Sequence, residues 1–178
     1  MKFSEKNLKG VYLIEPEPHV DERGMLRRHF CQHEFADYGL MTEIKQTNVS
    51  ENRKKLTLRG FHFQYPPHGE NKVISCIKGS IYDIIVDLRK KSKTYLQWQS
   101  FELTEENRLS IYVPIGCANA YLTLQDNTWI LYYHSEFYSP GDEGSIRYND
   151  PYFKFMWPAE PKVISVKDLN ILDWVPNK

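Results

Sequence analysis

The feature that most constrains the fold is a series of short apolar or alternating segments, each bounded by Gly, Pro, Asn or Asp. Residues 73–77 are typical of a strand, residues 78–80 of a turn, and residues 81–88 of the returning strand. In that second strand Asp83 and Asp87 share one face because side chains alternate along a strand. The other face carries Tyr82, Ile84, Val86 and Leu88.

Further strands are predicted on both sides of the Pro114-Ile115-Gly116 turn and over residues 128–138, where Ile130, Tyr132 and His134 share a face. Helical signals are few and short. We expect helices or helical turns at residues 4–7, 32–38, 104–107 and 165–169. No repeat or linker divides the chain, so the prediction is one domain over residues 1–178, an all-β antiparallel jelly roll of cupin type.

Composition excludes several classes of function. Lys+Arg and Asp+Glu both number 23, and no basic face is visible, which argues against nucleic-acid binding. The three cysteines match no zinc or redox spacing, and no signal peptide or membrane-length apolar run is present. We therefore expect a cytoplasmic protein that binds neither nucleic acid nor membrane. The 14% aromatic content suits sheet surfaces and a stacking pocket.

The densest chemistry lies in residues 58–64, where alternation places Gly60, His62 and Gln64 on one strand face. A histidine there has two interpretations. It can be a base that works near neutral pH, or a hydrogen-bonded structural histidine, which is the commoner case for an isolated residue. The neighbouring Arg59 offers a rigid fork of donors for phosphate oxygens.

The order of motifs along the chain adds context for this segment. Over nearly its whole length the chain resembles the dTDP-4-dehydrorhamnose 3,5-epimerase family. The matching residues are Asp21-Glu22-Arg23-Gly24, Gln46-Thr47-Asn48-Val49-Ser50, the 59–64 segment, Lys72-Val73-Ile74, Gly79-Ser80-Ile81-Tyr82-Asp83, Val86-Asp87-Leu88-Arg89, Ser92-Lys93-Thr94, Pro114-Ile115-Gly116, Tyr132, Tyr138-Ser139-Pro140, Tyr148-Asn149-Asp150-Pro151, Trp157-Pro158 and Ser165-Val166-Lys167-Asp168.

The resemblance implies an epimerase of a nucleotide-linked 4-keto sugar, without a cofactor, that forms a homodimer partly by exchange of N-terminal strands. It implies His62 as the base and Asp168 as its partner. Tyr132 is then the acid on the opposite face of the sugar, and Lys72 stabilises the enolate. These roles make chemical sense, because a C–H bond beside a ketone needs a positioned base and a stabilised enolate oxygen.

The resemblance also implies a set of binding residues. Arg23 and Arg59 correspond to diphosphate contacts, and Gln46 and Asn48 to polar contacts with the sugar or nucleotide. The predicted substrate-binding set is completed by Asn119, Tyr138 and Arg28. Each of the four catalytic candidates also has a structural alternative, such as a packing role for Tyr132 or a helix-capping role for Asp168.

A metal site is not expected. Many cupins bind metal through His-x-His, followed by a further His after Pro-x-Gly, whereas this chain carries Gln64 and Asn119 at the second and last of these positions. Two of three imidazole ligands are therefore missing.

Two departures from the family leave the substrate open. Leu26 and Arg28 replace the Phe and Glu that family members usually place near the thymidine. This difference favours GDP or CDP as the nucleotide. It is consistent with membership of a branch that acts on GDP-linked 4-keto heptoses in capsular polysaccharide or lipopolysaccharide synthesis. Asn119 replaces a histidine and cannot shuttle a proton at neutral pH. The alternatives are therefore an epimerase that inverts C3 or C5 only, a 3,4-ketoisomerase, or a nucleotide-sugar-binding cupin without turnover.

Overall fold

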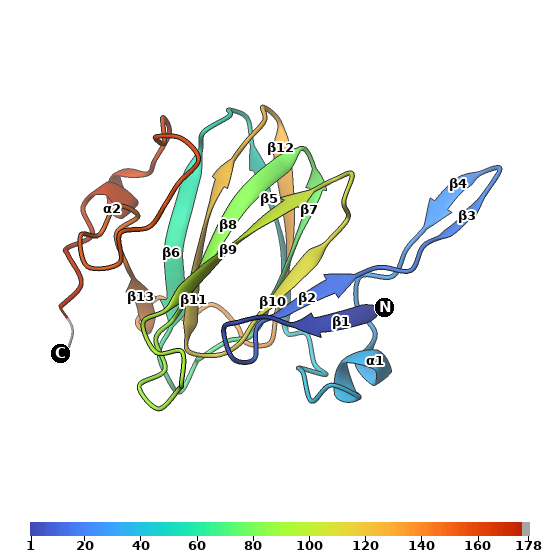
Figure 1. The fold of residues 1–178 in the computed structure, drawn as a ribbon, viewed down its shortest axis with the longest axis horizontal. Coiled ribbons are helices and arrows are strands. Elements are labelled where there is room, and N and C mark those ends of the chain that lie inside the picture. Colours follow the sequence, from blue (N-terminus) through green and yellow to red (C-terminus); the bar gives the residue numbers. More distant parts are fainter. Residues whose placement is uncertain (176–178) are drawn as a thin grey trace.

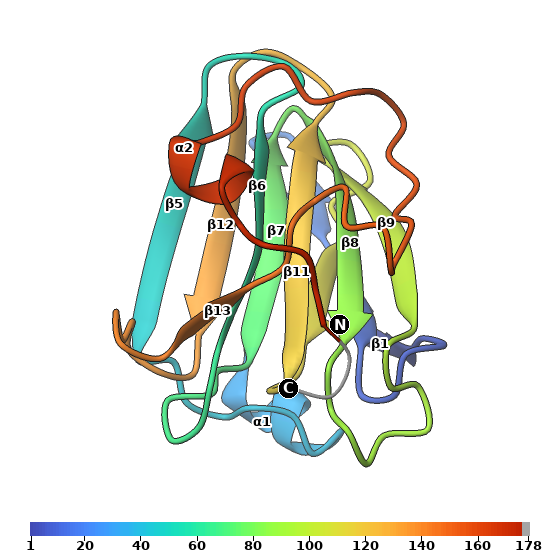
Figure 2. The same ribbon diagram turned by 90° about the vertical axis from the view of Figure 1, so that its left-hand side faces the viewer.

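The computed structural model, described here over residues 1–175, consists of two antiparallel sheets that face each other (Figures 1 and 2). The predicted all-β, cupin-like architecture is confirmed. The first sheet has the strand order β1 (Lys2–Glu5), β2 (Tyr12–Glu15), β10 (Ser110–Val113), β7 (Lys72–Lys78), β12 (Thr128–His134), β5 (Gln46–Asn52). The second has the order β13 (Glu143–Ser145), β6 (Leu58–Gln64), β11 (Cys117–Thr123), β8 (Ser80–Asp87), β9 (Trp98–Thr104).

The main core fills the space between the sheets. Alternation along β7 and β8 sends Ile74, Ile81 and Ile85 inward, and all three are fully buried. Each such side chain contributes about 1.5–3 kcal/mol of hydrophobic stabilisation. The sandwich is therefore held by the inward faces of both sheets, and the polar residues on those faces need hydrogen-bonding partners.

Two smaller clusters cover the outer faces. Helix α1 (Gln32–Ala36) packs Phe35 on the first sheet, beside Val73 and Tyr112. On the second sheet, Phe61 stacks on Phe155 of the C-terminal segment at a ring-centroid distance of 4.3 Å. This segment also carries helix α2 (Val166–Leu169), which lies beside β6 (Figure 2). The C-terminal segment is thereby fixed against the strand that carries His62.

One element stands apart from the sandwich. The hairpin of β3 (His19–Asp21) and β4 (Gly24–Leu26) projects away from both sheets (Figure 1). Its apolar residues Val20 and Leu26 are 72% and 73% exposed.

Most of the predicted elements are confirmed with shifted ends. The predicted faces of β8 are observed, and the helical signals at 32–38 and 165–169 correspond to α1 and α2. At residues 104–107 the Thr104 hydroxyl accepts from the Asn107 amide at 2.9 Å, as a cap should. The helix expected at 4–7 is wrong, because Ser4 pairs with Leu13 in the sheet. A helix of one turn has too few hydrogen bonds to compete with such pairing.

The strand predicted over 128–138 is too long. β12 ends at His134. The Ser135 amide still donates to the Asn71 carbonyl at 3.0 Å, but the Asn71 amide donates to the Ser135 hydroxyl at 2.8 Å, so the backbone ladder stops at this pair.

Candidate active site

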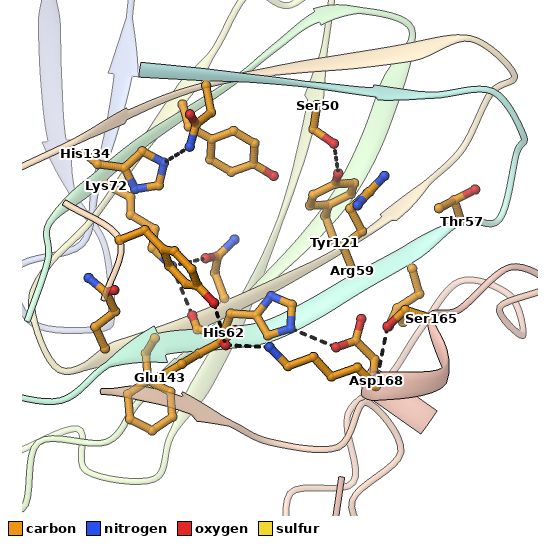
Figure 3. A pocket seen from close by; sticks show the side chains of 18 of the residues that line it. Ser50, Thr57, Arg59, His62, Lys72, Tyr121, His134, Glu143, Ser165 and Asp168 are labelled. Carbon is orange, nitrogen blue, oxygen red and sulfur yellow. Dashed lines mark hydrogen bonds and ion pairs between the residues drawn. The ribbon is translucent and has the colours of Figure 1, made fainter. Parts of the chain in front are cut away.

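A cavity of about 570 Å³ opens between the sheets, and its residues come from both of them and from the C-terminal segment (Figure 3). This volume suits a small-molecule ligand. Strands β6 and β11 line one wall, strands β5, β7 and β12 the other, and α2 closes one side. Of the predicted site residues, the cavity is lined by His62, Asp168, Tyr132, Lys72, Arg59, Asn48, Asn119 and Tyr138.

The His62–Asp168 pair joins β6 to α2. The His62 Nε2 and Asp168 Oδ1 atoms are 2.8 Å apart (Figure 3). Asp168 is placed by the helix start, where its amide donates to the Ser165 hydroxyl at 3.0 Å. Burial alone would raise the pKa of Asp168, but the hydrogen bond and charge of His62 lower it below its usual value. An ionised Asp168 therefore fixes the orientation of the imidazole through Nε2 and leaves the other ring nitrogen, Nδ1, to face a substrate.

The backbone of β6 reaches this position because residue 60 is glycine. Gly60 has a φ of +111°, and an added Cβ would lie 2.6 Å from the Asn119 carbonyl oxygen and 2.7 Å from the Ala120 Cβ. Any side chain at residue 60 would therefore push β6 away from β11 and displace His62.

Lys72 begins β7 and is only 6% exposed. Its Nζ donates to the His62 carbonyl at 3.0 Å and to the Asn119 Oδ1 at 3.3 Å, and it lies 3.3 Å from Glu70 Oε1. The ammonium group of Lys72 thus reaches from β7 to the backbone of the strand that carries the imidazole.

Tyr132 lies on β12 of the opposite sheet. Burial raises the pKa of Tyr132 well above its usual value, and the neighbouring Tyr121 hydroxyl adds to this effect. Tyr132 therefore keeps its phenolic proton at neutral pH. The Tyr121 hydroxyl is itself 3.0 Å from Ser50 Oγ.

The predicted binding residues differ in how they are placed. Arg59 lines the cavity and donates from Nε to the Asn52 Oδ1 at 2.8 Å. Asn48 and Tyr138 also face the cavity. Gln46 is outside the lining but supports it, because its Oε1 accepts from the Tyr138 amide at 3.2 Å.

Arg23 and Arg28 lie outside this cavity. Arg23 is on the projecting hairpin and pairs with Asp21 at 2.5 Å, while Arg28 follows the hairpin and pairs with Glu34 at 2.6 Å. Within one chain, these two predicted contacts are therefore not brought to His62.

Besides Tyr121, four charged or titratable residues of the cavity were not predicted as site residues from the sequence. They are Glu70, His134, Glu143 and Lys167. His134 shares a strand face with Tyr132, so alternation alone could have drawn attention to it. Glu70 lies in a loop, Glu143 begins strand β13 and Lys167 lies in α2, and no local pattern predicts that the three meet in one cavity.

Among residues 1–175, no group of three or more His, Cys, Asp or Glu side chains could hold a metal ion. Over the same residues no helix is long and apolar enough to cross a membrane.

Comparison with known proteins gives consistent results. The model of the family described as dTDP-4-dehydrorhamnose 3,5-epimerase matches residues 5–174. A dTDP-4-dehydrorhamnose 3,5-epimerase of Methanothermobacter thermautotrophicus is 37% identical over 98% of this chain and 94% of that protein. A dTDP-4-dehydrorhamnose 3-epimerase of Streptomyces niveus is 29% identical over 97% of this chain and 83% of that protein.

A solved structure of similar fold is the dTDP-4-dehydrorhamnose 3,5-epimerase of Bacillus anthracis with TDP and PPi bound. It superposes with a TM-score of 0.93 at 33% identity, covering 97% of this chain and 99% of that one.

Proposed function

The chain belongs to the dTDP-4-dehydrorhamnose 3,5-epimerase family and is a sugar epimerase, and on this premise we propose that it is a 3,5-epimerase, which inverts both C3 and C5 of a nucleotide-linked 4-keto sugar. The observation that carries the proposal is the 2.8 Å His62–Asp168 pair beside the Lys72 ammonium in one cavity. A base, its orienting carboxylate and a cation are the groups that enolate chemistry requires.

In the first step, His62 removes a proton from a carbon next to the ketone. Asp168 occupies Nε2, so the proton goes to Nδ1, and the imidazolium that forms is stabilised by the Asp168 carboxylate. The C–H electron pair moves into the ring and leaves an enolate. The negative charge on the enolate oxygen is stabilised by Lys72.

In the second step, Tyr132 donates its phenolic proton to the same carbon from the opposite face. This role is supported by the placement of Tyr132 on the other sheet and by a raised pKa that keeps its proton in place until the carbanion forms. The Tyr132 phenolate then regains a proton from water and His62 releases one, so each turnover is balanced.

The diphosphate is assigned to Arg59 and Arg23. Arg59 lies in the same cavity as His62, whereas Arg23 is on the exposed hairpin. We propose that the chain works as a homodimer in which this hairpin reaches the partner's cavity and carries Arg23 with it. The exposed Val20 and Leu26 of the hairpin support such an interface.

The nucleotide is proposed to be GDP or CDP in place of dTDP, in surface-polysaccharide synthesis. Leu26 lacks the aromatic ring that family members offer the thymidine, and Arg28 replaces an acidic residue. The similar proteins are named for dTDP sugars, so this part of the proposal rests on the two substitutions alone.

A single-carbon epimerase is the second candidate. Asn119 is held between Lys72 and Asp83, with its Nδ2 3.2 Å from Asp83 Oδ1, and an amide cannot transfer a proton as a histidine would.

One experiment tests the function and separates the two candidates. The protein is incubated in D₂O with dTDP-, GDP- and CDP-linked 4-keto sugars, and the products are analysed by NMR and mass spectrometry. Deuterium at C3 and C5 with inversion supports the 3,5-epimerase, and label at one carbon supports the second candidate. Tight binding without any exchange would refute both.

A further inference from the structure

The cavity holds a second histidine–carboxylate pair, on the wall opposite His62. His134 Nδ1 is 2.7 Å from Glu70 Oε2, and Glu70 Oε1 is 3.3 Å from Lys72 Nζ. The His134, Glu70 and Lys72 side chains are 12%, 10% and 8% exposed. Strand register brings them together, because His134 pairs directly with Lys72 across β12 and β7. The mechanism above gives this pair no task.

In the pocket without substrate, every N–H donor of the Lys72 ammonium group already has an acceptor. An ammonium group has three N–H donors, and the Lys72 Nζ has three oxygen partners: the His62 carbonyl at 3.0 Å, Asn119 Oδ1 at 3.3 Å and Glu70 Oε1 at 3.3 Å. A substrate keto oxygen can therefore receive a hydrogen bond from Lys72 only if one of these three acceptors gives way.

Glu70 is the acceptor best able to give way. The His62 carbonyl is fixed in the backbone of β6, and the Asn119 amide is anchored at its other end by Asp83. Glu70 instead divides its two oxygens between Lys72 and His134, so it keeps a partner after Lys72 leaves. Burial would raise the pKa of Glu70, but His134 and Lys72 lower it below its usual value, so it stays ionised.

We propose that Glu70 and His134 are positioning residues for Lys72. Glu70 keeps the buried lysine charged in the free enzyme and yields it to the keto oxygen, while His134 holds Glu70 at the wall so that the carboxylate does not follow. This inference rests on the proposed function, because it assigns a control to the proposed enolate-stabilising lysine.

The charge balance explains why both residues are needed. A buried ammonium without a counter-ion loses its proton more easily, whereas a carboxylate that stays in contact with it cancels the charge the enolate needs. The other titratable groups that face this cluster are His62 on β6, Asp83 on β8 and Tyr132 on β12. Tyr132 stacks on His134 at 5.7 Å and ionises only at a pH well above its usual range.

The test is the pH profile of deuterium exchange into the substrate that the parent protein accepts. Glu70→Gln keeps the shape and one acceptor but removes the charge. The decline of kcat at high pH should then move by roughly one to three pH units toward neutrality, because the buried ammonium group loses its one carboxylate partner. An unchanged profile would overturn the proposal.

A matched control exists in the chain. His68 Nδ1 and Asp142 Oδ2 form another pair at 2.7 Å, which has no lysine partner among residues 1–175 and does not line the cavity. Asp142→Asn should keep the parent profile. A shift equal to that of Glu70→Gln would mean that the effect is general and would also refute the proposal.

His134 gives a second test that survives if Glu70→Gln fails to fold. His134→Ala should lower kcat about tenfold with little change in KM, and His134→Gln, whose amide can still donate to Glu70, should recover most of the loss. Equal rates in parent, Ala and Gln variants would contradict the role of His134. A parent protein without any exchange would refute the proposed function itself, so the two failures are distinguishable.

Discussion

Two aspartates on the inner face of β8 have opposite environments. Asp87 accepts hydrogen bonds from Arg89 at 2.8 Å, Ser92 at 2.5 Å and Thr94 at 2.7 Å. Asp83, four residues earlier, accepts one bond from Asn119 at 3.2 Å, and its Oδ2 has no hydrogen-bond partner within residues 1–175. Both residues are fully buried.

Their pKa values diverge accordingly. Burial raises the pKa of Asp83 to about 7, because one bond from Asn119 and the charge of Lys72 do not offset it. Burial acts on Asp87 too, but the bonds from Arg89, Ser92 and Thr94 lower its pKa to about 2.

The difference separates polar groups that stabilise the fold from polar groups that serve the cavity. Arg89, Ser92 and Thr94 all belong to the segment that follows β8, and all three donate hydrogen bonds to Asp87. The Asp87 cluster therefore holds this segment against the end of the strand. Asp83 lies next to Asn119 and Lys72, which line the cavity. At this position a buried carboxylate with too few hydrogen bonds is tolerated. Functional sites are where such costs are expected.

Of the two regions, the cavity should give the largest effect, a loss of the inversion rate when Tyr132 is changed. Tyr132→Phe should lower inversion by about a thousandfold with little loss of stability, because a proton donor is removed and the ring remains. Exchange with retained configuration should persist, since His62 can still remove the proton and return deuterium to the same face. NMR of the product in D₂O gives both rates, and parent-rate inversion by this variant would rule out Tyr132 as the acid.

At the other site the effect should appear in stability and leave activity largely intact. Asp87→Asn should reduce the free energy of unfolding by about 2–4 kcal/mol, because Arg89 loses its buried partner. Urea unfolding of parent and variant measures this difference. A loss below about 0.5 kcal/mol would show that the cluster is not stabilising.

The two aspartates should also give opposite pH dependences of stability. A lowered pKa makes Asp87 stabilising above its ordinary value of 3.8, and this contribution is lost as the pH falls toward about 2. A raised pKa means that folded Asp83 binds more protons than unfolded Asp83 between about pH 4 and 7, so the free energy of unfolding falls with rising pH in that window.

Asp83→Asn should remove that slope, which is on the order of 1 kcal/mol per pH unit. Unfolding titrations at pH 4, 5.5 and 7 provide the measurement. If parent and variant kept parallel stability profiles, Asp83 would be ionised throughout and the contrast with Asp87 would fail.

The smallest effect is expected at the hairpin, where Leu26 ends β4 and Arg28 follows two residues later. Restoring the family residues with Leu26→Phe and Arg28→Glu should raise affinity for dTDP relative to GDP by several-fold, as an added aromatic contact of about 1 kcal/mol predicts. Calorimetric titration with each nucleotide is suitable. No change in the ratio of affinities would remove the argument against thymidine.

Much of this arrangement could be predicted from the sequence, for identifiable reasons. Alternation places Asp83 and Asp87 on one face and His62 with Gln64 on another, and these placements are observed. The helical turn predicted over 165–169 corresponds to α2, and its Ser165 cap positions Asp168. What alternation cannot supply is the approach of Glu70, which lies in a loop and meets His134 only because β7 and β12 pair in one register.

The misplaced predictions have a common cause. The segment 4–7 and the end of β12 are decided by partners distant in sequence, Leu13 and Asn71, which no local pattern reveals. Likewise Arg23 matches the family motif, but the folded single chain holds it on the hairpin, away from the cavity. Local patterns therefore predict which face a residue occupies better than where an element ends or which distant residue it meets.

The central claim is that His62 is the base, and deuterium exchange by His62→Asn tests it most directly. The variant keeps a polar side chain at the same site but cannot accept a proton at neutral pH. We predict that exchange at the carbons next to the ketone falls by more than about a thousandfold, while nucleotide binding stays near the parent value. Exchange at a near-parent rate in a folded, nucleotide-binding His62→Asn protein would contradict the account.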